Sequence, residues 1–287
     1  MNERSTYNHR LMIKITRDTL PQVKEKYPFI YLERGRLEID GNSVMWIDCE
    51  GRVIRLPIAT INCLLLGPGT TITHEAVKVL AASNCNACWV GEDSMHFYAC
   101  GFTPTADSTN FFRQMQLAAN KKQSLEVARR LFSKRFPHDD LSNKNLTSMM
   151  GLEGARVREL YKKKAEEYHV GWKGRSYTPG KFEFSTITNQ ILTSSNAALY
   201  SILCSAIHSM GYSPHMGFIH KGSPLPFVYD MADLYKEYLC IDLAFSLTNH
   251  LAGVYNKHKV EDAFRKRVIE MGLLKQIGSD IQQLFSF

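Results

Sequence analysis

The chain lacks the long apolar runs that membrane-spanning proteins carry. It has 287 residues, 44% of them hydrophobic, yet no stretch of 18 consecutive apolar residues occurs, so we expect no membrane span. The first six residues, Met1 to Thr6, also lack the apolar core of a secretion signal. We therefore expect the protein to stay in the cytoplasm.

Cysteine is too sparse and too scattered for a secreted disulfide framework. There are seven cysteines, an odd number, and only the pair Cys85 and Cys88 has the spacing of a metal or redox motif. A structural zinc site needs two more ligands at matching spacing, and no second such pair exists. Because Cys88 leads into the apolar residues Trp89 and Val90, we predict that both thiols lie in the core.

The two ends of the chain lack any excess of positive charge. Of the 35 Lys and Arg residues, 16 fall in residues 111–182, against 7 Asp and Glu there, while the flanking segments are close to neutral. A clustered basic excess indicates a polyanionic partner such as a nucleic acid. A solvated helix surface would give the same pattern.

Residues 1–100 have the pattern of a small β domain. Short alternating or apolar runs separated by Gly, Asp and Asn turns predict a meander in a sandwich or open barrel. One helix is expected near residues 73–82, with Thr73 as its N-cap and His74 at its surface. The predicted strands lie at residues 29–33, 36–39, 43–48, 52–57, 61–66, 86–90 and 95–99.

From residue 111 the apolar period changes from two to about 3.6, as in amphipathic helices. The polar segment 101–110 is the predicted linker, and residues 111–287 are the predicted catalytic and DNA-binding domain. The fold class is therefore α+β, with a small N-terminal β-sandwich-like domain and a larger all-α domain. Helices are expected at 111–136, 147–169, 188–210, 227–252 and 258–285, and the small residues of 188–210 predict a central position for that helix.

Chemistry is concentrated in the segment Gly217 to Asp233. It holds one imidazole, His220, and two carboxylates, Asp230 and Asp233, and Pro224 and Pro226 allow a helix to begin near Phe227. The two acids are then three residues apart on one helical face. Imidazole and carboxylate suit Mn²⁺ or Mg²⁺, although a turn histidine with two solvated acids would have the same spacing.

A second candidate is Glu153, which stands between Gly151 and Gly154 on a predicted helix. Each helical glycine costs about 1 kcal/mol relative to alanine. Close approach of a DNA strand or a metal ion would explain that cost. A tight helix crossing with Glu153 paired to an arginine is the alternative.

Three segments together resemble the family of CRISPR adaptation integrases, CRISPR-associated protein one. They are Gly151 to Arg158, Thr186 to Tyr200 and Gly217 to Asp233, and the strands around Leu65 to Thr70 and Trp89 to Glu92 are similar too. The resemblance covers residues 25–275 and looks like the type I-E branch. It implies homodimers, two of which flank a small partner subunit, CRISPR-associated protein two. It also implies a DNA duplex with single-stranded 3′ ends that is joined to repeat and leader DNA.

The resemblance implies a role for individual residues. The family's metal ligands fall on Glu153, His220 and Asp233, which would hold Mg²⁺ or Mn²⁺, and Asp230 matches an acid that supports this catalytic group. Tyr177 and Tyr229 match tyrosines that face DNA. Further predicted DNA contacts are Arg34, Arg156, Arg158, Lys162, Arg175 and Lys221.

One departure from the type I-E pattern concerns the opening of the duplex end. Where that pattern can place an aromatic residue before a glycine, this chain has Arg34 before Gly35. We expect either that Tyr31 separates the strands instead or that Arg34 stacks on the last base pair.

The predicted activity is metal-dependent phosphoryl transfer on DNA, as an integrase or, with water as the nucleophile, an endonuclease. Two alternatives stay open. One is an iron enzyme with His220 and His215 plus a carboxylate as ligands. The other is a nucleic-acid-binding scaffold whose site is catalytically idle.

Overall fold

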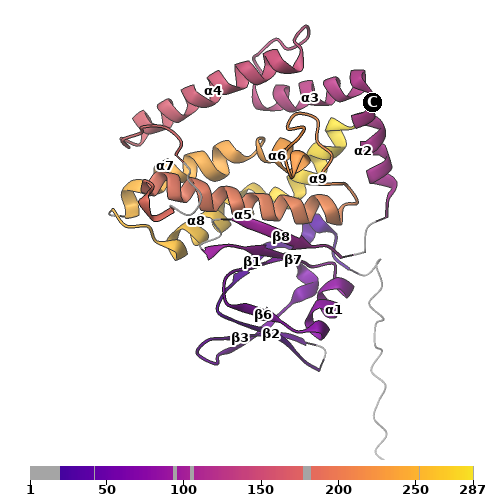
Figure 1. The fold of residues 1–287 in the computed structure, drawn as a ribbon, viewed down its shortest axis with the longest axis vertical. Coiled ribbons are helices and arrows are strands. Elements are labelled where there is room, and N and C mark those ends of the chain that lie inside the picture. The colour runs from indigo at the N-terminus through magenta and orange to yellow at the C-terminus, as the bar shows by residue number, and fades with distance from the viewer. Residues whose placement is uncertain are drawn as a thin grey trace, which may run out of the picture.

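The computed structural model describes residues 20–41, 43–92, 96–103, 107–176, 182–251 and 253–286. Within them, two four-stranded sheets come first and helices follow (Figure 1). The sheets lie at one end, the helix α5 lies along one of them, and α3 and α4 lie farthest away. This arrangement confirms the predicted fold class. The domain boundaries at residues 100 and 110 stay a prediction.

The strands form one mixed sheet, ordered β1-β5-β7-β8, and a second sheet, ordered β4-β3-β2-β6. Strands β2, β3 and β4 pair as the predicted antiparallel meander, but β1 pairs in parallel with β5. Sequence patterning missed β6, a three-residue strand after the turn at Gly67. The strands are β1 (Tyr27–Leu32), β2 (Gly35–Asp40), β3 (Ser43–Asp48), β4 (Val53–Leu56), β5 (Ile61–Leu66), β6 (Thr70–Ile72), β7 (Asn86–Val90) and β8 (Phe97–Gly101).

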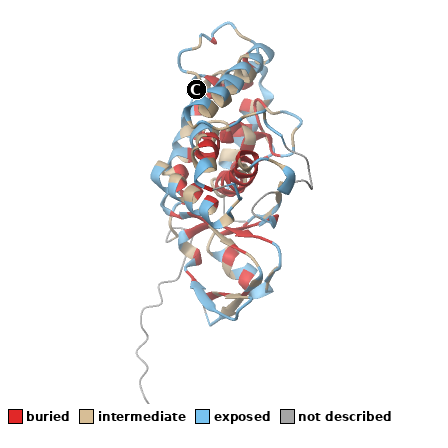
Figure 2. Cartoon of the chain, turned by 90° about the vertical axis from the view of Figure 1, so that its left-hand side faces the viewer, coloured by how far each residue is buried: buried red, intermediate tan, exposed pale blue. Residues whose placement is uncertain are grey.

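Strand β5 is buried along its whole length because it serves two cores. Leu64 and Leu66 pack between the two sheets, whereas Cys63 and Leu65 face the helices. Such two-sided burial explains why β5 is an uninterrupted apolar run rather than an alternating one. Figure 2 shows the buried residues gathered between the sheets and around the inner helices.

The helices are shorter and more numerous than the sequence pattern predicts. The expected helix at residues 111–136 is wrong as a single element, because it divides at Asn120. That residue has extended backbone, and its side chain accepts a hydrogen bond from the Gln123 N–H at 3.1 Å, which starts a new helix. The segment 258–285 divides at Gly272, whose φ of 64° is left-handed. The expected helix at 227–252 is also wrong as a single element, because it divides into Pro226–Ala232, the π-helical Glu237–Asp242 and Leu243–Thr248.

The helices are α1 (His74–Ala82), α2 (Thr109–Ala119), α3 (Lys121–Arg135), α4 (Leu146–Glu167), α5 (Ile187–Ser209), α6 (Pro226–Ala232), a π-helical segment (Glu237–Asp242), α7 (Leu243–Thr248), α8 (Lys257–Met271) and α9 (Leu273–Leu284). Thr73 caps α1 and His74 is exposed, as predicted. None of the helices in the described ranges combines the length and apolar character that a bilayer crossing requires.

Helix α5 is central, as its small residues predict. Eighteen of its 23 residues are buried, and it packs against both the mixed sheet and the C-terminal helices. Helix α4 is the opposite case, because Met149 is its only buried residue. Cys85 and Cys88 are buried, which confirms the prediction of core thiols.

Phe285, the residue that follows α9, packs into the protein itself. Phe285 is buried, and its ring lies 5.4 Å from Phe218 and 5.8 Å from Phe227, measured between ring centroids. Phe218 begins the segment that leads to His220. The C-terminal aromatic residue therefore supports the loop in which the predicted site lies.

Candidate functional site

The loop that carries His220 is held against α6 by a buried carboxylate. Asp230 is 1% exposed and accepts hydrogen bonds from the backbone N–H groups of Phe218, Ile219 and His220 at 2.5, 3.2 and 3.0 Å. Only glycine fits at position 217, because a Cβ there would lie 2.7 Å from Pro226 and 2.9 Å from Asp230. The approach of this loop to α6 is thereby fixed.

Asp230 also orients the imidazole. Its Oδ1 lies 2.8 Å from His220 Nδ1, so the other ring nitrogen, Nε2, points toward Asp233, 3.6 Å from its Oδ2. This contact with Asp230 raises the pKa of His220 and outweighs the opposite effect of burial. The predicted face shared by Asp230 and Asp233 is therefore the face that meets His220.

Asp233 follows the last turn of α6 and is nearly buried. Burial acts to raise the pKa of its carboxyl, but Lys236 and Arg135 outweigh burial and hold that pKa below its ordinary value. Lys236 Nζ lies 2.8 Å from Asp233 Oδ1, and the pKa of Lys236 is raised by this partner in spite of its burial. Asp233 is therefore an anion in the folded protein.

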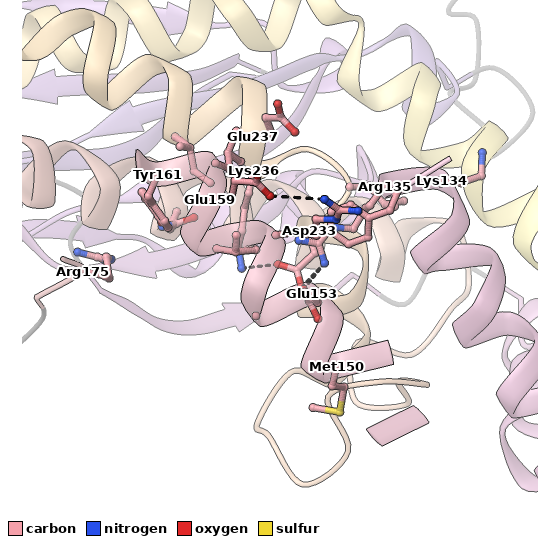
Figure 3. Close-up of a pocket in the computed structure, with 18 of the residues that line it drawn as sticks. Lys134, Arg135, Met150, Glu153, Glu159, Tyr161, Arg175, Asp233, Lys236 and Glu237 are labelled. Atoms are coloured by element: carbon pink, nitrogen blue, oxygen red, sulfur yellow. Dashed lines mark hydrogen bonds and ion pairs between the residues drawn. The ribbon is translucent and has the colours of Figure 1, made fainter. Parts of the chain in front are cut away.

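Glu153 reaches the same place from α4. Its Oε1 is paired with Nη1 of Arg135 at the end of α3, and that same nitrogen lies 3.6 Å from Asp233 Oδ2. All three side chains are between 11% and 15% exposed. Figure 3 shows Glu153, Asp233 and Arg135 pointing toward one another.

These side chains line a cavity of about 900 Å³ between α3, α4, α5 and the segment after α6. Six of its lining residues are Lys or Arg and four are Asp or Glu, so a basic wall surrounds the acidic cluster. In Figure 3, Arg175 and Lys134 lie on either side of that cluster. The size and charge suit a phosphate-bearing polymer rather than an apolar ligand.

Glu153, His220 and Asp233 fit a divalent ion by donor chemistry. One imidazole nitrogen and two carboxylates suit Mn²⁺ or Mg²⁺, and Asp230 fixes the histidine as carboxylates do beside metal centres. Their spacing is not that of a closed site, since no group of three such donors in the described residues lies close enough to hold a metal. The guanidinium of Arg135 lies between the two carboxylates instead.

Two of the predicted DNA contacts line this cavity. They are Arg156, which pairs with Asp139 at 2.8 Å, and Arg175, which donates to Asn189 and Thr193. Arg158 and Lys162 lie on the exposed side of α4. For all four residues, contact with DNA stays a prediction.

The remaining predicted contacts lie elsewhere. Lys221 donates to Ser124 at 3.1 Å, and Tyr229 packs edge-on against Tyr200, with ring centroids 5.0 Å apart. Tyr177 lies outside the described residues. Lys221 and Tyr229 do not line the cavity.

At the β1–β2 turn, Arg34 is the exposed residue and Tyr31 is the anchored one. Tyr31 donates to Glu33 at 2.8 Å, and the Lys257 ammonium lies 4.2 Å from the centre of its ring. Arg34 has a left-handed φ of 55° and a side chain that is 65% exposed. Of the two residues predicted to act at a duplex end, Arg34 is the accessible one.

Sequence patterning missed two residues at the centre of the site. Arg135 lies on the helix expected at residues 111–136, where the amphipathic pattern leaves basic residues on the water-facing side, yet its side chain is only 13% exposed. Its place depends on where α3 ends relative to α4, which no local pattern reveals. The sequence did contain a signal for Lys236. It stands three residues after Asp233, a spacing that places the two side chains on the same side of a helix and so predicts an ion pair.

His215 does not join His220. It lines a separate cavity with Phe111 and Tyr212, and its Nδ1 lies 2.9 Å from the Pro224 carbonyl oxygen. The donor set that an iron enzyme with two histidines needs is therefore not assembled among the described residues.

A family model described as CRISPR associated protein Cas1 matches residues 138–264. Over 275 residues the chain is 66% identical to a protein of Chlorobaculum tepidum named CRISPR-associated endonuclease Cas1 2, and the match covers 96% of this chain and 93% of that protein.

Solved structures give the same result. A structure titled as a TtCas1–DNA complex has a TM-score of 0.68 and 36% identity, and the match covers 93% of this chain and 99% of that one. A Cas6-RT-Cas1–Cas2 complex shares the fold, with a TM-score of 0.67 at 14% identity over 93% of this chain and 36% of that one.

Proposed function

The chain belongs to the Cas1 family of CRISPR-associated endonucleases, and from this premise we propose that it is a metal-dependent integrase of spacer acquisition. It joins the 3′-hydroxyl ends of a captured DNA fragment to repeat DNA by transesterification. The observation that carries the proposal is that Glu153, His220 and Asp233, from three separate elements, line one basic cavity, with Asp233 facing both His220 and the arginine that pairs with Glu153.

The reaction exchanges one phosphodiester bond for another. The fragment's 3′ oxygen forms a bond to phosphorus as the bond to the leaving 3′ oxygen breaks. The attacking hydroxyl gives its proton to solvent, and the leaving oxygen takes one up from solvent. Glu153, His220 and Asp233 would hold a divalent ion, which would supply charge stabilisation at that phosphate. No energy-carrying cofactor is needed, and with water as the nucleophile the same site acts as an endonuclease.

The protein's own groups position the reactants. Asp230 fixes the His220 ring through Nδ1 and fixes its loop through three backbone N–H groups, so it acts as a positioning residue. Arg156 and Arg175 on the cavity wall hold the phosphate backbone without reading bases. We propose that Arg158, Lys162 and Lys221 extend this track and that Tyr177, Tyr229 and Arg34 contact the splayed ends.

The partners proposed for this chain follow from its family. They are a duplex with single-stranded 3′ ends, repeat and leader DNA, and the small subunit Cas2, with two homodimers in each complex. Support for DNA and Cas2 comes from the structural relatives whose titles name them. We also propose the type I-E branch, on the combination of motifs, and a cytoplasmic location.

A strand-joining assay tests the proposal. Purified protein with Cas2 meets a short labelled duplex and a repeat-containing plasmid in Mn²⁺, Mg²⁺ or EDTA. We expect metal-dependent joining that His220→Ala abolishes and His215→Ala retains. The latter is a matched control, because it removes an imidazole five residues away that lines a different cavity.

The second candidate function is an idle DNA-binding scaffold. The observation that favours it is Arg135, which already neutralises the acids that a metal needs. A scaffold binds DNA equally well in EDTA and joins nothing in any metal. That result, or equal joining by wild type and His220→Ala, would contradict the integrase proposal.

A further inference from the structure

A single nitrogen atom, Nη1 of Arg135, lies between two of the three proposed ligands. Arg135 Nη1 pairs with Glu153 Oε1 and lies 3.6 Å from Asp233 Oδ2. That carboxylate oxygen also faces His220 Nε2, again at 3.6 Å. Lys236, by contrast, contacts the other oxygen of Asp233, Oδ1, at 2.8 Å.

The charges show why the cation is held there. Arg135 lies between the two acids Glu153 and Asp233, while Lys236 pairs with Asp233 alone. Without Arg135, the carboxylates of Glu153 and Asp233 would face each other with little exposure to water. Two like charges repel each other strongly in such a place. The guanidinium therefore stabilises the cluster when nothing else neutralises it.

Arg135 also contacts an aromatic ring. Its guanidinium carbon lies 5.0 Å from the centre of the Phe136 ring, at the distance of a cation–π contact. Arg135 is the last residue of α3 and Phe136 follows it. The side chain can leave the cluster by rotating at a helix end, with no change to the fold.

We propose that Arg135 is an internal counter-cation that keeps the acidic cluster assembled in the metal-free protein and that a divalent ion must displace. The proposal rests on the proposed function, since it concerns the same three ligands. It assigns Arg135 a regulatory role, because metal affinity is set by competition with a resident positive charge. The protein then binds its metal weakly when alone and keeps a formed site.

Mn²⁺ binding to the full-length protein, measured by titration calorimetry without DNA, tests the competition. We expect Arg135→Gln to bind Mn²⁺ at least about tenfold more tightly than wild type, because a unit positive charge a few ångströms from a dication is removed. Lys122→Gln is the matched control. It removes the same charge from an exposed position of the same helix, outside the cavity, and its affinity stays within about twofold of wild type.

Thermal melting tests the clamp separately. In EDTA, Arg135→Gln melts below both wild type and Lys122→Gln, and Mn²⁺ raises its melting temperature by more than it raises theirs. Arg135→Lys, which keeps the charge but not the planar group, falls between wild type and Arg135→Gln in Mn²⁺ affinity.

The outcomes separate this proposal from the proposed function. Equal or weaker Mn²⁺ binding by Arg135→Gln overturns the competition, while metal-dependent joining by wild type would leave the integrase standing. Full stability of Arg135→Gln in EDTA overturns the clamp. Absence of Mn²⁺ binding in all the variants overturns the competition and the proposed metal site together.

Discussion

The two ends of α4 enter two ionic clusters that are equally buried and yet differ in kind. Near its C-terminal end, Lys164 meets Asp242 at 2.6 Å, and Arg267 meets the other oxygen of Asp242 at 2.9 Å. Near its N-terminal end, Glu153 meets Arg135 and Asp233. The side chains of both clusters are between 11% and 17% exposed, so burial does not distinguish them.

Open space does distinguish them. The Asp242 cluster is satisfied within the protein, since Lys164 and Arg267 both pair with Asp242 and Tyr168 completes it with a hydrogen bond of 3.0 Å. The Glu153 cluster opens onto the large cavity. A buried ion pair is therefore evidence for a reactive site only where it lies beside accessible space.

The largest expected effect is on strand joining, which depends on the N-terminal end of α4 and not on its C-terminal end. Glu153→Gln keeps the shape of the side chain but removes a charged metal ligand, so joining falls by about a hundredfold to a thousandfold. DNA affinity, measured by filter binding, changes by less than about twofold. Lys164→Met at the other end of the helix retains joining at a temperature where the variant is folded, and comparable loss in both variants would remove the distinction.

The next effect concerns stability at the end of α4 that lies beside Asp242. Asp242→Asn leaves Lys164 and Arg267 without their shared anion and lowers the free energy of unfolding by about 2 kcal/mol in urea titration. Asp262→Asn is the control, because Asp262 pairs with Arg265 at the surface with 66% of its side chain exposed. That variant loses less than about 0.5 kcal/mol. Equal losses in the two variants would show that Asp242 is no more than a surface acid.

The same cluster gives a pH dependence of known sign. Burial acts to raise the pKa of Asp242, but Lys164, Tyr168 and Arg267 outweigh it and hold the pKa below its ordinary value of 3.8. Because the folded pKa is lowered, the stabilisation is complete above that ordinary value and is lost as pH falls through the lowered one. The difference in melting temperature between wild type and Asp242→Asn therefore stays constant from pH 7 to 5 and shrinks below about pH 4. A difference that grows on acidification would reverse the sign.

The smallest effect concerns the glycines beside Glu153. A Cβ at Gly151 would meet nothing within 4 Å, so a tight helix crossing does not explain this glycine. Gly151→Ala should raise the free energy of unfolding by up to about 1 kcal/mol. If a DNA strand approaches the backbone here, the same variant binds DNA more weakly, which a filter-binding titration measures.

Gly217→Ala is the contrasting variant. Its Cβ would lie 2.7 Å from Pro226, so it destabilises the protein and displaces the His220 loop. A gain in both stability and DNA affinity for Gly151→Ala would indicate that the glycine serves no close approach.

Sequence patterning reached the fold class and the donor residues but not the relations between them. Apolar periodicity located α4 and α5 to within a residue or two, since each is a long regular element. It missed the break at Asn120, where one side-chain cap outweighs a continuous amphipathic pattern. It also missed β6, whose three residues form a strand only because β2 lies beside them.

The candidate site shows the same limit. His220, Asp230 and Asp233 lie within 14 residues and could be found by spacing, whereas Glu153 was singled out by its flanking glycines and joined to this group only by the family resemblance. Arg135 has no signal at all, because a basic residue on an amphipathic helix normally faces water. Its role depends on the packing of α3 against α4, which is a tertiary property.

Strand β5 has a consequence for how this protein can change in length. Leu64 and Leu66 belong to one core and Cys63 and Leu65 to the other, so successive residues pack against different neighbours. Inserting or deleting one residue within β5 would exchange the two sets and disrupt both cores at once. Natural relatives should therefore vary in length in the loops around this strand and never inside it, and fusion junctions belong in those loops as well.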